Sequence, residues 1–368
     1  MNARPANDEI AAEFHDAAAR LLADRKTVTR LLADARAQGL TGDWRAIGEA
    51  GWFRILQPEV SGGLGLSLVE LAAVFRAVGA QPVRGPLAEA AVCLPLLDDL
   101  FVERGARAAI DQALDGRAIV TFAEPLEAPG CEAMAFDANR LCGTAPLVPF
   151  ANEAAGLIVA AGTSEDAALI YLERGDYAVE PVASLDPTTS YATVRFDVTP
   201  ATDRVLARGT VAHARRIQLL AARRLMAAAE LAGATAALTA MSVDYAKMRV
   251  QFSQPIGRFQ AVQHMLAALA ARSTALSSLV RASVRDARDD PEGLEDRAVI
   301  AFAYAIEIGR YAAEEAMQIH GGIGFTQELA LHLHYRRVLT HQGRLGDMYD
   351  LWPVIGSRQL GPAASGRA

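Results

Sequence analysis

Two segments decide the fold: R-V-Q-F-S-Q-P-I-G-R-F-Q-A-V-Q from Arg249 to Gln263, and Q-I-H-G-G-I-G-F-T-Q-E from Gln318 to Glu328. The first predicts a helix that ends near Met248, a loop marked by proline and glycine, and a new helix that begins at Phe259. In the second, three glycines within four residues interrupt a helical pattern, and each costs about 1 kcal/mol relative to alanine inside a helix. Both segments therefore mark breaks between long helices.

Each break has a structural and a functional interpretation. Arg249 at a turn can hold a pyrophosphate through two parallel hydrogen bonds, and Gln260 near the start of the next helix can meet a phosphate or an adenine edge. An ordinary helix-loop-helix corner explains the same pattern. The glycines at Gly321 and Gly322 either form a plain loop or let a cofactor approach bare backbone. The run is not G-x-G-x-x-G and does not follow a strand, which excludes a Rossmann site.

The chain is an α+β multidomain protein by length and pattern. Its 368 residues exceed one ordinary core, so two or three domains are expected. Helical spacing at Ile10–Leu32 and Val69–Val78 predicts an N-terminal helical domain over 1–116. Short apolar runs predict a middle β domain over 117–210. The predicted strands are Ala118–Phe122, Gly156–Ala161, Ala168–Leu172 and Ala192–Val198. Four long Ala/Leu-rich segments predict a C-terminal four-helix bundle over 211–368.

Composition excludes several classes of protein. A net charge of −7 and a pI near 5.6 argue against a nucleic-acid partner, which needs a basic face. Three widely spaced cysteines, Cys93, Cys131 and Cys142, form no disulfide framework and no C-x-x-C pair, which fits a reducing cytoplasm. We expect no secretory signal and, because charge interrupts Leu219–Gly233, no membrane span. The histidines lack metal-ligand spacing, so no metal site is expected.

The two segments resemble the flavin-binding signatures of the acyl-CoA dehydrogenase family, R-x-x-F-G-x-x-I-x-x-F-Q and Q-x-x-G-G-x-G. The family's glycine after the phenylalanine is Ser253 in this chain. Segments near the N-terminus, such as P-E-V-S-G-G-L-G-L-S-L-V-E from Pro58, are also similar to the family. The residues that match are Arg249, Phe252, Ile256, Phe259, Gln260, Gln318, Gly321, Gly322 and Gly324. The resemblance implies an N-terminal helical domain, a β-barrel-like middle domain and a C-terminal four-helix bundle.

The resemblance also implies FAD as cofactor, an acyl-CoA thioester as substrate, and an electron-transfer flavoprotein as electron acceptor. It implies that a set of residues in the C-terminal helices contacts the ADP half of a flavin that is bound mainly by a neighbouring subunit. The protein is therefore expected to form at least a dimer, either a homo-oligomer or a hetero-oligomer. These residues are Arg249, Gln260, Gln318, Gly321 and Gly322, and Phe252 in the first segment is a further cofactor-binding candidate. The isoalloxazine side falls to Thr121, in a T-F-A-E-P segment that looks like a shortened family loop, and to Val148.

The family's catalytic glutamate has no counterpart at either of its known positions. Alignment of R-R-V-L-T-H-Q-G-R-L-G-D with the usual segment places Leu345 at the glutamate, and counting back from Tyr245 places Arg223 at the alternative position. Two nearby carboxylates are candidate bases for removal of the substrate α-proton. Glu230 lies on an apolar helix, where a structural ion pair is the alternative interpretation, and Asp347 follows the leucine, where a loop or cap role is the alternative.

A second resemblance concerns the C-terminus. Some bacterial acyl-CoA dehydrogenases consist of two unlike chains, and the chain without the glutamate ends in a pattern similar to His332-Leu-His-Tyr-Arg-Arg followed by Gly346-Asp347. The sequence leaves three hypotheses open. The first is an FAD-dependent acyl-CoA dehydrogenase in lipid metabolism, acting alone or as half of a two-chain enzyme. The second is a flavin-holding or structural subunit, and the third is a flavin-dependent oxygenase on the same fold.

Overall fold

The computed structural model describes residues 4–23, 42–126 and 133–360, and the chain divides into two compact units. The first, the helical unit, comprises Met1–Val28, Leu68–Pro82 and Arg224–Ala368. The second, the mixed unit, comprises Thr29–Ser67 and Val83–Arg223. The predicted three-domain division at 1–116, 117–210 and 211–368 remains a prediction.

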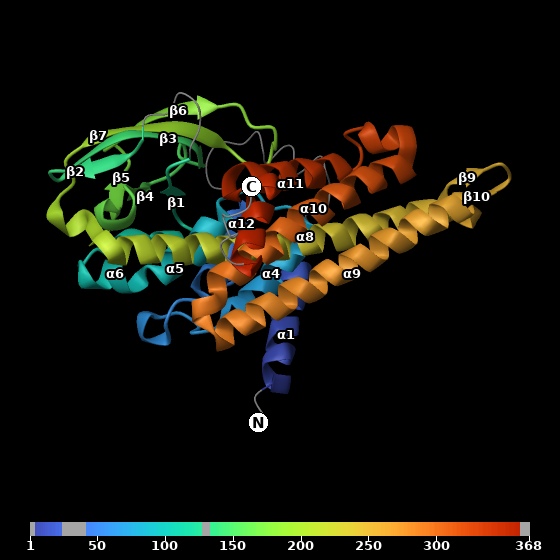
Figure 1. Ribbon diagram of the computed structural model, residues 1–368, viewed down its shortest axis with the longest axis horizontal. Helices are drawn as coiled ribbons and strands as arrows, with labels where there is room; N and C mark the ends of the chain where they lie inside the picture. The colour runs from blue at the N-terminus through green and yellow to red at the C-terminus, as the bar shows by residue number, and fades with distance from the viewer. Residues whose placement is uncertain (1–3, 24–41, 127–132, 361–368) are drawn as a thin grey trace, which may run out of the picture. The chain divides into compact units, whose positions relative to one another are not determined.

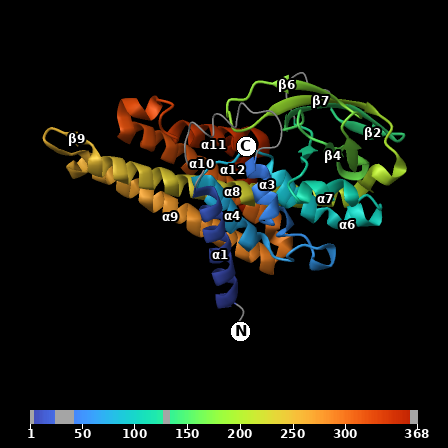
Figure 2. The ribbon, with the colours of Figure 1, turned by 180° about the vertical axis from the view of Figure 1, so that it is seen from behind.

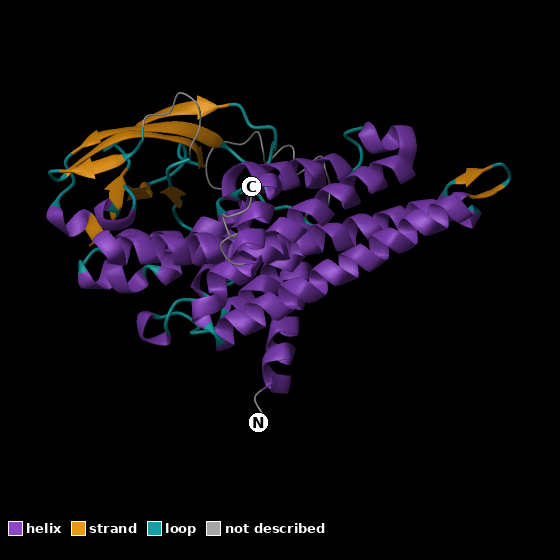
Figure 3. Ribbon diagram, in the orientation of Figure 1, coloured by secondary structure: helices purple, strands orange, loops and turns teal. Residues whose placement is uncertain are grey.

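Long helices build the helical unit, in agreement with the predicted C-terminal bundle (Figure 3). They are α1 (Arg4–Ala23), α4 (Leu68–Ala80), the C-terminal part of α8 (Gly209–Met248), α9 (Gln260–Asp289), α10 (Leu294–His320), α11 (Leu331–Leu345) and α12 (Met348–Leu360). Helix α10 packs against α9, α11 and α12, and α4 packs against α1 and α9. The predicted helix over Val69–Val78 lies within α4; of the one over Ile10–Leu32, the part to Ala23 lies in α1, and 24–32 is outside the described residues.

Two glycines allow α4 and α8 to cross at close range. A Cβ atom added at Gly79 would lie 1.7 Å from the carbonyl oxygen of Glu230, and one added at Gly233 would lie 1.9 Å from that of Arg76. Real Cβ atoms do not approach backbone this closely, so only glycine permits the two helices to pack here. The crossing fixes the position of Glu230, one of the two candidate bases.

The mixed unit holds two four-stranded sheets, which confirm the predicted β region (Figures 1 and 3). One sheet has the order β1 (Val120–Ala123), β4 (Gly156–Ala161), β5 (Ala168–Glu173), β8 (Val205–Arg208). The other has the order β2 (Ala135–Asp137), β3 (Arg140–Pro149), β7 (Tyr191–Val198), β6 (Ala178–Val182). Strand β1 pairs with β4 in parallel, and the other neighbours within both sheets are antiparallel. Both strands of the parallel pair are buried throughout, as their unbroken apolar runs predict.

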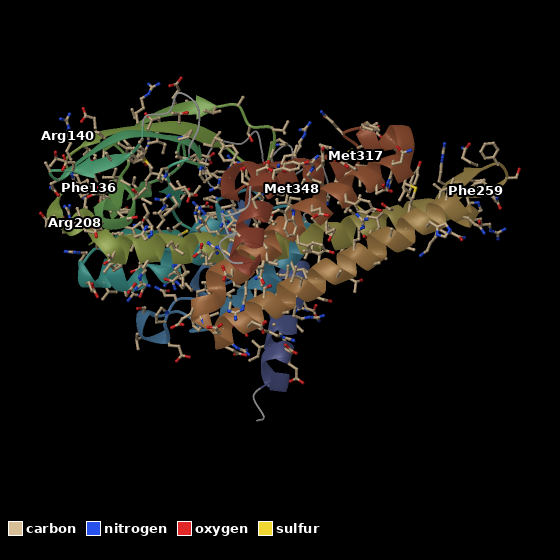
Figure 4. The ribbon with its side chains drawn as sticks, viewed as in Figure 1. Phe136, Arg140, Arg208, Phe259, Met317 and Met348 are labelled. Carbon is tan, nitrogen blue, oxygen red and sulfur yellow. The ribbon has the colours of Figure 1, made fainter. Side chains whose placement is uncertain are left out.

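The side chain of Arg208 links the two sheets. It extends from β8, and its guanidinium lies 4.4 Å from the centre of the Phe136 ring on β2 (Figure 4). Shorter helices complete the mixed unit: α3 (Gly42–Glu49), α5 (Leu94–Leu96), α6 (Asp98–Glu103) and α7 (Ala108–Leu114). Cys93 is buried and Cys142 is half-buried, and Cys131 lies outside the described residues.

One described helix, α8, is long and apolar enough to cross a membrane by these two measures alone. However, 67% of its most apolar 18-residue window is buried within the protein. A buried core helix has the same length and composition, so this finding is weak evidence for a span.

Candidate functional site

The two signature segments lie at the same end of the helical unit. Tyr245, near the end of α8, stacks on His320, the last residue of α10, with ring centres 4.4 Å apart and an interplanar angle of 25°. Leu238 and Ile319 belong to the apolar cluster beneath this stack. Packing between α8 and α10 therefore brings together segments that are about seventy residues apart in the sequence.

The first segment contains a β-hairpin that the sequence did not reveal. Strand β9 (Val250–Gln251) pairs with β10 (Gln254–Pro255) beyond the end of α8, as Figures 1 and 2 show from opposite sides. The turn residues Phe252 and Ser253 have φ angles of 49° and 63°. A two-residue hairpin of this type needs positive φ at both positions, which explains why the family carries glycine where this chain has Ser253. The glycine that the family carries at this position is the signal that could have predicted the turn, and this chain lacks it.

Arg249 is placed where it can receive an anion. Its backbone is fixed, because its amide donates to the Tyr245 carbonyl and its carbonyl accepts from the Ile256 amide, both at 2.8 Å. Its side chain is exposed and forms no ion pair within the described residues. Gln260, the first residue of α9, and Gln318, in the last turn of α10, are exposed as well.

The glycine run ends α10 and forms the short helix η8 (Gly321–Phe325). Gly321 has φ +62°, and a Cβ added at Gly321 or Gly322 would meet no atom within 4 Å. Gly324 differs, because a Cβ there would lie 2.9 Å from the carbonyl oxygen of Met317 on α10. Packing therefore requires Gly324, whereas Gly321 and Gly322 leave open backbone that a cofactor can approach.

Exposed aromatic side chains flank these polar candidates. Phe252 on the hairpin is 87% exposed and Phe325 on η8 is 77% exposed. Phe259, which packs edge-on to Phe252 with ring centres 6.2 Å apart, is labelled beside the hairpin in Figure 4. Large exposed apolar side chains next to a polar site are typical of an interaction surface.

The predicted ring-side residues lie in the mixed unit and are buried. Thr121 on β1 is 1% exposed, and its hydroxyl has no hydrogen-bond partner among the described residues. Val148 on β3 is 2% exposed and follows an irregularity in the pairing of β3 with β7, where Leu147 has φ 53°. A buried hydroxyl without a partner is unusual in a native protein and is available to a ligand. Within the helical unit, the Arg249 guanidinium and the open glycine backbone fit the pyrophosphate side of a dinucleotide such as FAD. Within the mixed unit, the Thr121 hydroxyl separately fits a polar group of a ligand.

Leu345, at the usual base position, is the last residue of α11 and is 5% exposed. Its carbonyl oxygen accepts a hydrogen bond of 2.9 Å from Nε of Arg224. Gly346 follows with φ 122°, a conformation that favours glycine. Arg224 thus fixes the backbone at the usual base position, but the side chain of Leu345 cannot accept a proton.

Arg223, at the alternative base position, is 1% exposed and binds Glu124 at 2.7 Å. Its second carboxylate neighbour, Glu89, lies 4.0 Å away, and its guanidinium lies 4.9 Å from the centre of the Phe122 ring. Burial is the largest single effect and acts to lower the pKa of Arg223, but the charges of Glu124, Cys93 and Glu89 and the hydrogen bond to Glu124 together outweigh it, so the pKa is raised. The side chain stays protonated and cannot act as a base. Sequence reasoning missed both carboxylates, which lie about a hundred residues or more from Arg223.

The candidate base Glu230 lies in a buried cluster of charges within the helical unit. It is 4% exposed; Nε2 of His341 donates to its Oε2 at 3.2 Å, and Nη1 of Arg337 lies 3.6 Å from its Oε1. Burial acts to raise the pKa of Glu230, but His341 and Arg337 outweigh it and the pKa lies below its ordinary value. This geometry matches the structural ion pair, and a role as base stays a prediction.

Asp347, the other candidate, precedes α12. Its Oδ1 accepts the backbone amide of Tyr349 at 2.8 Å, and its Oδ2 accepts a hydrogen bond from the side chain of Gln342. An aspartate that accepts the amide two residues ahead at a helix start is a helix N-cap. The structure therefore gives Asp347 a capping role, and its catalytic role stays a prediction.

His334, which lies beside this charge cluster, makes stability depend on pH. Burial lowers the pKa of His334 to about 4; Arg337 adds to the shift and Glu230 opposes it. The unfolded chain takes up a proton below pH 6.5 that the folded chain resists, so stability present above pH 6.5 is lost as the pH falls towards 4. At 1.36 kcal/mol per pKa unit, we expect a loss of about 3 kcal/mol.

Urea unfolding measured from pH 7 to pH 4 tests this expectation. His334→Gln should weaken the dependence of the unfolding free energy on pH. The same change at His264, which is exposed on α9, should leave that dependence unaltered. Identical slopes for the wild type and both variants would contradict the assignment.

Comparison with known proteins identifies the family of the chain. The model of the family "Acyl-CoA dehydrogenase, C-terminal domain" matches residues 214–346. The acyl-CoA dehydrogenase IpdE2 of Mycobacterium tuberculosis is 30% identical over 80% of this chain and 79% of its own. The acyl-CoA dehydrogenase FadE34 of the same organism is 29% identical over 84% of this chain, which spans only 41% of FadE34. The chain therefore belongs to the acyl-CoA dehydrogenase family.

Solved structures agree on the fold. Butyryl-CoA dehydrogenase from Megasphaera elsdenii superposes with a TM-score of 0.85 at 19% identity, covering 95% of this chain and 98% of that one. A variant of the steroid acyl-CoA dehydrogenase Tcur3481-Tcur3483 superposes with a TM-score of 0.83 at 26% identity, covering 98% of this chain and 100% of that one. The predicted architecture of N-terminal helices, middle β region and C-terminal bundle is confirmed.

Proposed function

We propose that this chain is one half of a two-chain, FAD-dependent acyl-CoA dehydrogenase and that the catalytic base belongs to its partner. The reaction would remove the α-proton and the β-hydride of an acyl-CoA thioester. In such an enzyme, the partner would supply the base, and this chain would supply residues that bind the cofactor and part of the shared fold.

The observation that carries the proposal is the chemistry at the two base positions. Leu345 has no titratable side chain, and Arg223 is a buried cation held by Glu124. The nearby acids are already engaged, Glu230 with Arg337 and His341, and Asp347 with the start of α12. A general base must reach the proton that it removes and be free to accept it. A glutamate on a second chain would meet this requirement.

The relatives support the same division. The structure named Tcur3481-Tcur3483 steroid acyl-CoA dehydrogenase contains a chain 26% identical to this one, and the structure named ChsE4-ChsE5 complex, from Mycobacterium tuberculosis, contains a chain of the same fold. By analogy, the proposed partner is a second acyl-CoA dehydrogenase-like chain, and the proposed substrate is a CoA thioester. The exposed side chains of Phe252 and Phe325 supply an apolar surface for an oligomer contact beside the ADP-side candidates.

FAD would supply the hydride acceptor. Arg249 would bind the pyrophosphate with its free guanidinium, and Gln260 and Gln318 would offer amides to the ADP half. Gly321 and Gly322 would let the phosphates or ribose reach bare backbone. On the ring side, Thr121 would donate its unpartnered hydroxyl, and Val148 would give an apolar contact.

Flavin content tests the cofactor assignment. Arg249→Ala and Gly322→Val are each expected to lose most bound FAD, because one removes a charge-assisted contact and the other blocks close approach. Since a Cβ at Gly322 meets no atom within 4 Å, the valine should not disturb folding. Matched controls are Arg258→Ala, an exposed arginine on the same loop, and Gly343→Val, a second glycine with open space around it. Full flavin occupancy in both test variants would refute the placement.

A further inference from the structure

The helical unit contains a cavity of about 210 Å³, lined by α1, α4, α8 and α9, that none of the proposed flavin or acyl-CoA residues enters. It lies beside the close crossing of α4 and α8 at Gly79 and Gly233. The helices contribute small side chains here, among them Ala72, Ala229 and Ala232, so the space between them is left unfilled. An engineered apolar cavity of about 150 Å³ is already large enough to bind benzene.

The rim of this cavity is positively charged. Arg76 on α4 and Arg281 and Arg285 on α9 line it together with a single acid, Asp8 on α1. Asp8 forms an ion pair with Arg285, which leaves two positive charges in excess. Neither Arg76 nor Arg281 has a hydrogen-bond or ion-pair partner within the described parts of the chain.

The two arginines also repel each other. Burial lowers the pKa of Arg76, the charge of Arg281 lowers it further, and Asp16 only partly offsets both. A negative group between the two guanidinium groups would relieve this repulsion. Arginine guanidinium groups bind carboxylates through paired charge-assisted hydrogen bonds, and Arg76 is half-buried whereas Arg281 is exposed.

We propose that this cavity is a binding site for a small amphipathic carboxylate. Its carboxylate would lie between Arg76 and Arg281, and its hydrocarbon body would fill the apolar floor formed by Ala72, Ala232 and Val280. The apolar floor excludes a fully hydrated anion such as inorganic phosphate as the preferred ligand, and the charged rim excludes a neutral hydrocarbon. The site is separate from the proposed cofactor residues and does not depend on the proposed function.

Calorimetric titration of the purified chain with octanoate, octanol and octylamine tests the proposal. We expect one octanoate per chain at this site and at least about tenfold weaker binding of octanol, because hydrogen bonds to charged groups are the strong ones. Octylamine should not bind, since its charge matches that of the rim. Equal affinities for octanoate and octanol would overturn the proposal.

Variants locate the binding. Arg76→Gln and Arg281→Gln should each weaken octanoate binding about tenfold. Arg288→Gln, which is also on α9 but outside the cavity lining, should leave the affinity for octanoate unchanged. Ala73→Leu, at a half-buried lining position, should displace octanoate by filling the cavity while the circular dichroism spectrum stays that of the wild type. Octanoate affinity that is unaltered in all of the lining variants would place the ligand elsewhere and overturn the assignment.

Discussion

Purified alone, the chain is expected to oxidise acyl-CoA thioesters about 10²–10⁴-fold more slowly than the same chain assembled with a glutamate-bearing partner, which is the usual contribution of general-base catalysis. The reason is the pair of non-acids at the base positions, Leu345 and Arg223. Dye reduction with a panel of acyl-CoA thioesters measures the difference. The partner to use is an acyl-CoA dehydrogenase-like chain encoded beside this one, with its own glutamate intact.

Two controls separate a missing base from other defects. The partner with its glutamate changed to glutamine should assemble with this chain, retain flavin and remain slow. Glu230→Gln and Asp347→Asn in this chain should leave the rate of the assembled enzyme within a few-fold, because Glu230 serves an ion pair and Asp347 a helix cap. Robust turnover by the lone chain, abolished by one of these two changes, would identify a relocated base and contradict the proposal.

Glu230→Gln is expected to destabilise the helical unit by about 3–5 kcal/mol, the usual cost of breaking a buried charge pair by removing one partner. The substitution keeps the shape of the side chain but leaves Arg337, 8% exposed, and His341 without the carboxylate that faces them. Because the pKa of Glu230 lies below its ordinary value, its contribution is present above pH 4.5 and is lost as the pH falls through the folded pKa.

The matched control is Glu314→Gln on α10. Its side chain is 55% exposed, and it pairs with Arg310 at 3.8 Å one turn away. Exposed pairs of this kind contribute about 0.3–0.5 kcal/mol to stability, so the urea midpoint of the control should lie near that of the wild type. Urea midpoints at pH 7 give the comparison. Equal midpoints for Glu230→Gln and the wild type would mean that the ion pair contributes no net stability.

The sequence predicted most of the architecture because the architecture follows from hydrophobic periodicity. The unbroken apolar runs at Gly156–Ala161 and Ala168–Leu172 lie in β4 and β5, and the glycine run after Gln318 ends α10. The hairpin at 250–255 escaped prediction because its strands have only two residues each and its turn contains no glycine. The stack of Tyr245 on His320, which brings the two signatures together, is a tertiary contact that no local pattern encodes.

The environments of the candidate bases were the least predictable part of the site. The sequence indicates that Glu230 lies on an apolar helix, but its partners Arg337 and His341 lie more than a hundred residues away on α11. Glu124 reaches Arg223 across a similar separation. Long-range pairs of this kind depend on how helices pack. For Asp347, in contrast, the cap could be predicted, because an aspartate directly before a helical segment is a common N-cap.

Exchange of the substrate α-proton in deuterated water, followed by NMR on a saturated acyl-CoA thioester, shows directly whether the catalytic base lies on this chain or on its partner. Exchange reports the base alone and needs no electron acceptor. We expect no exchange above the buffer rate with the lone chain, and rapid exchange once a glutamate-bearing partner is added. Exchange catalysed by the lone chain, and lost in Glu230→Gln or Asp347→Asn, would show that this chain carries its own base and would contradict the proposed two-chain enzyme.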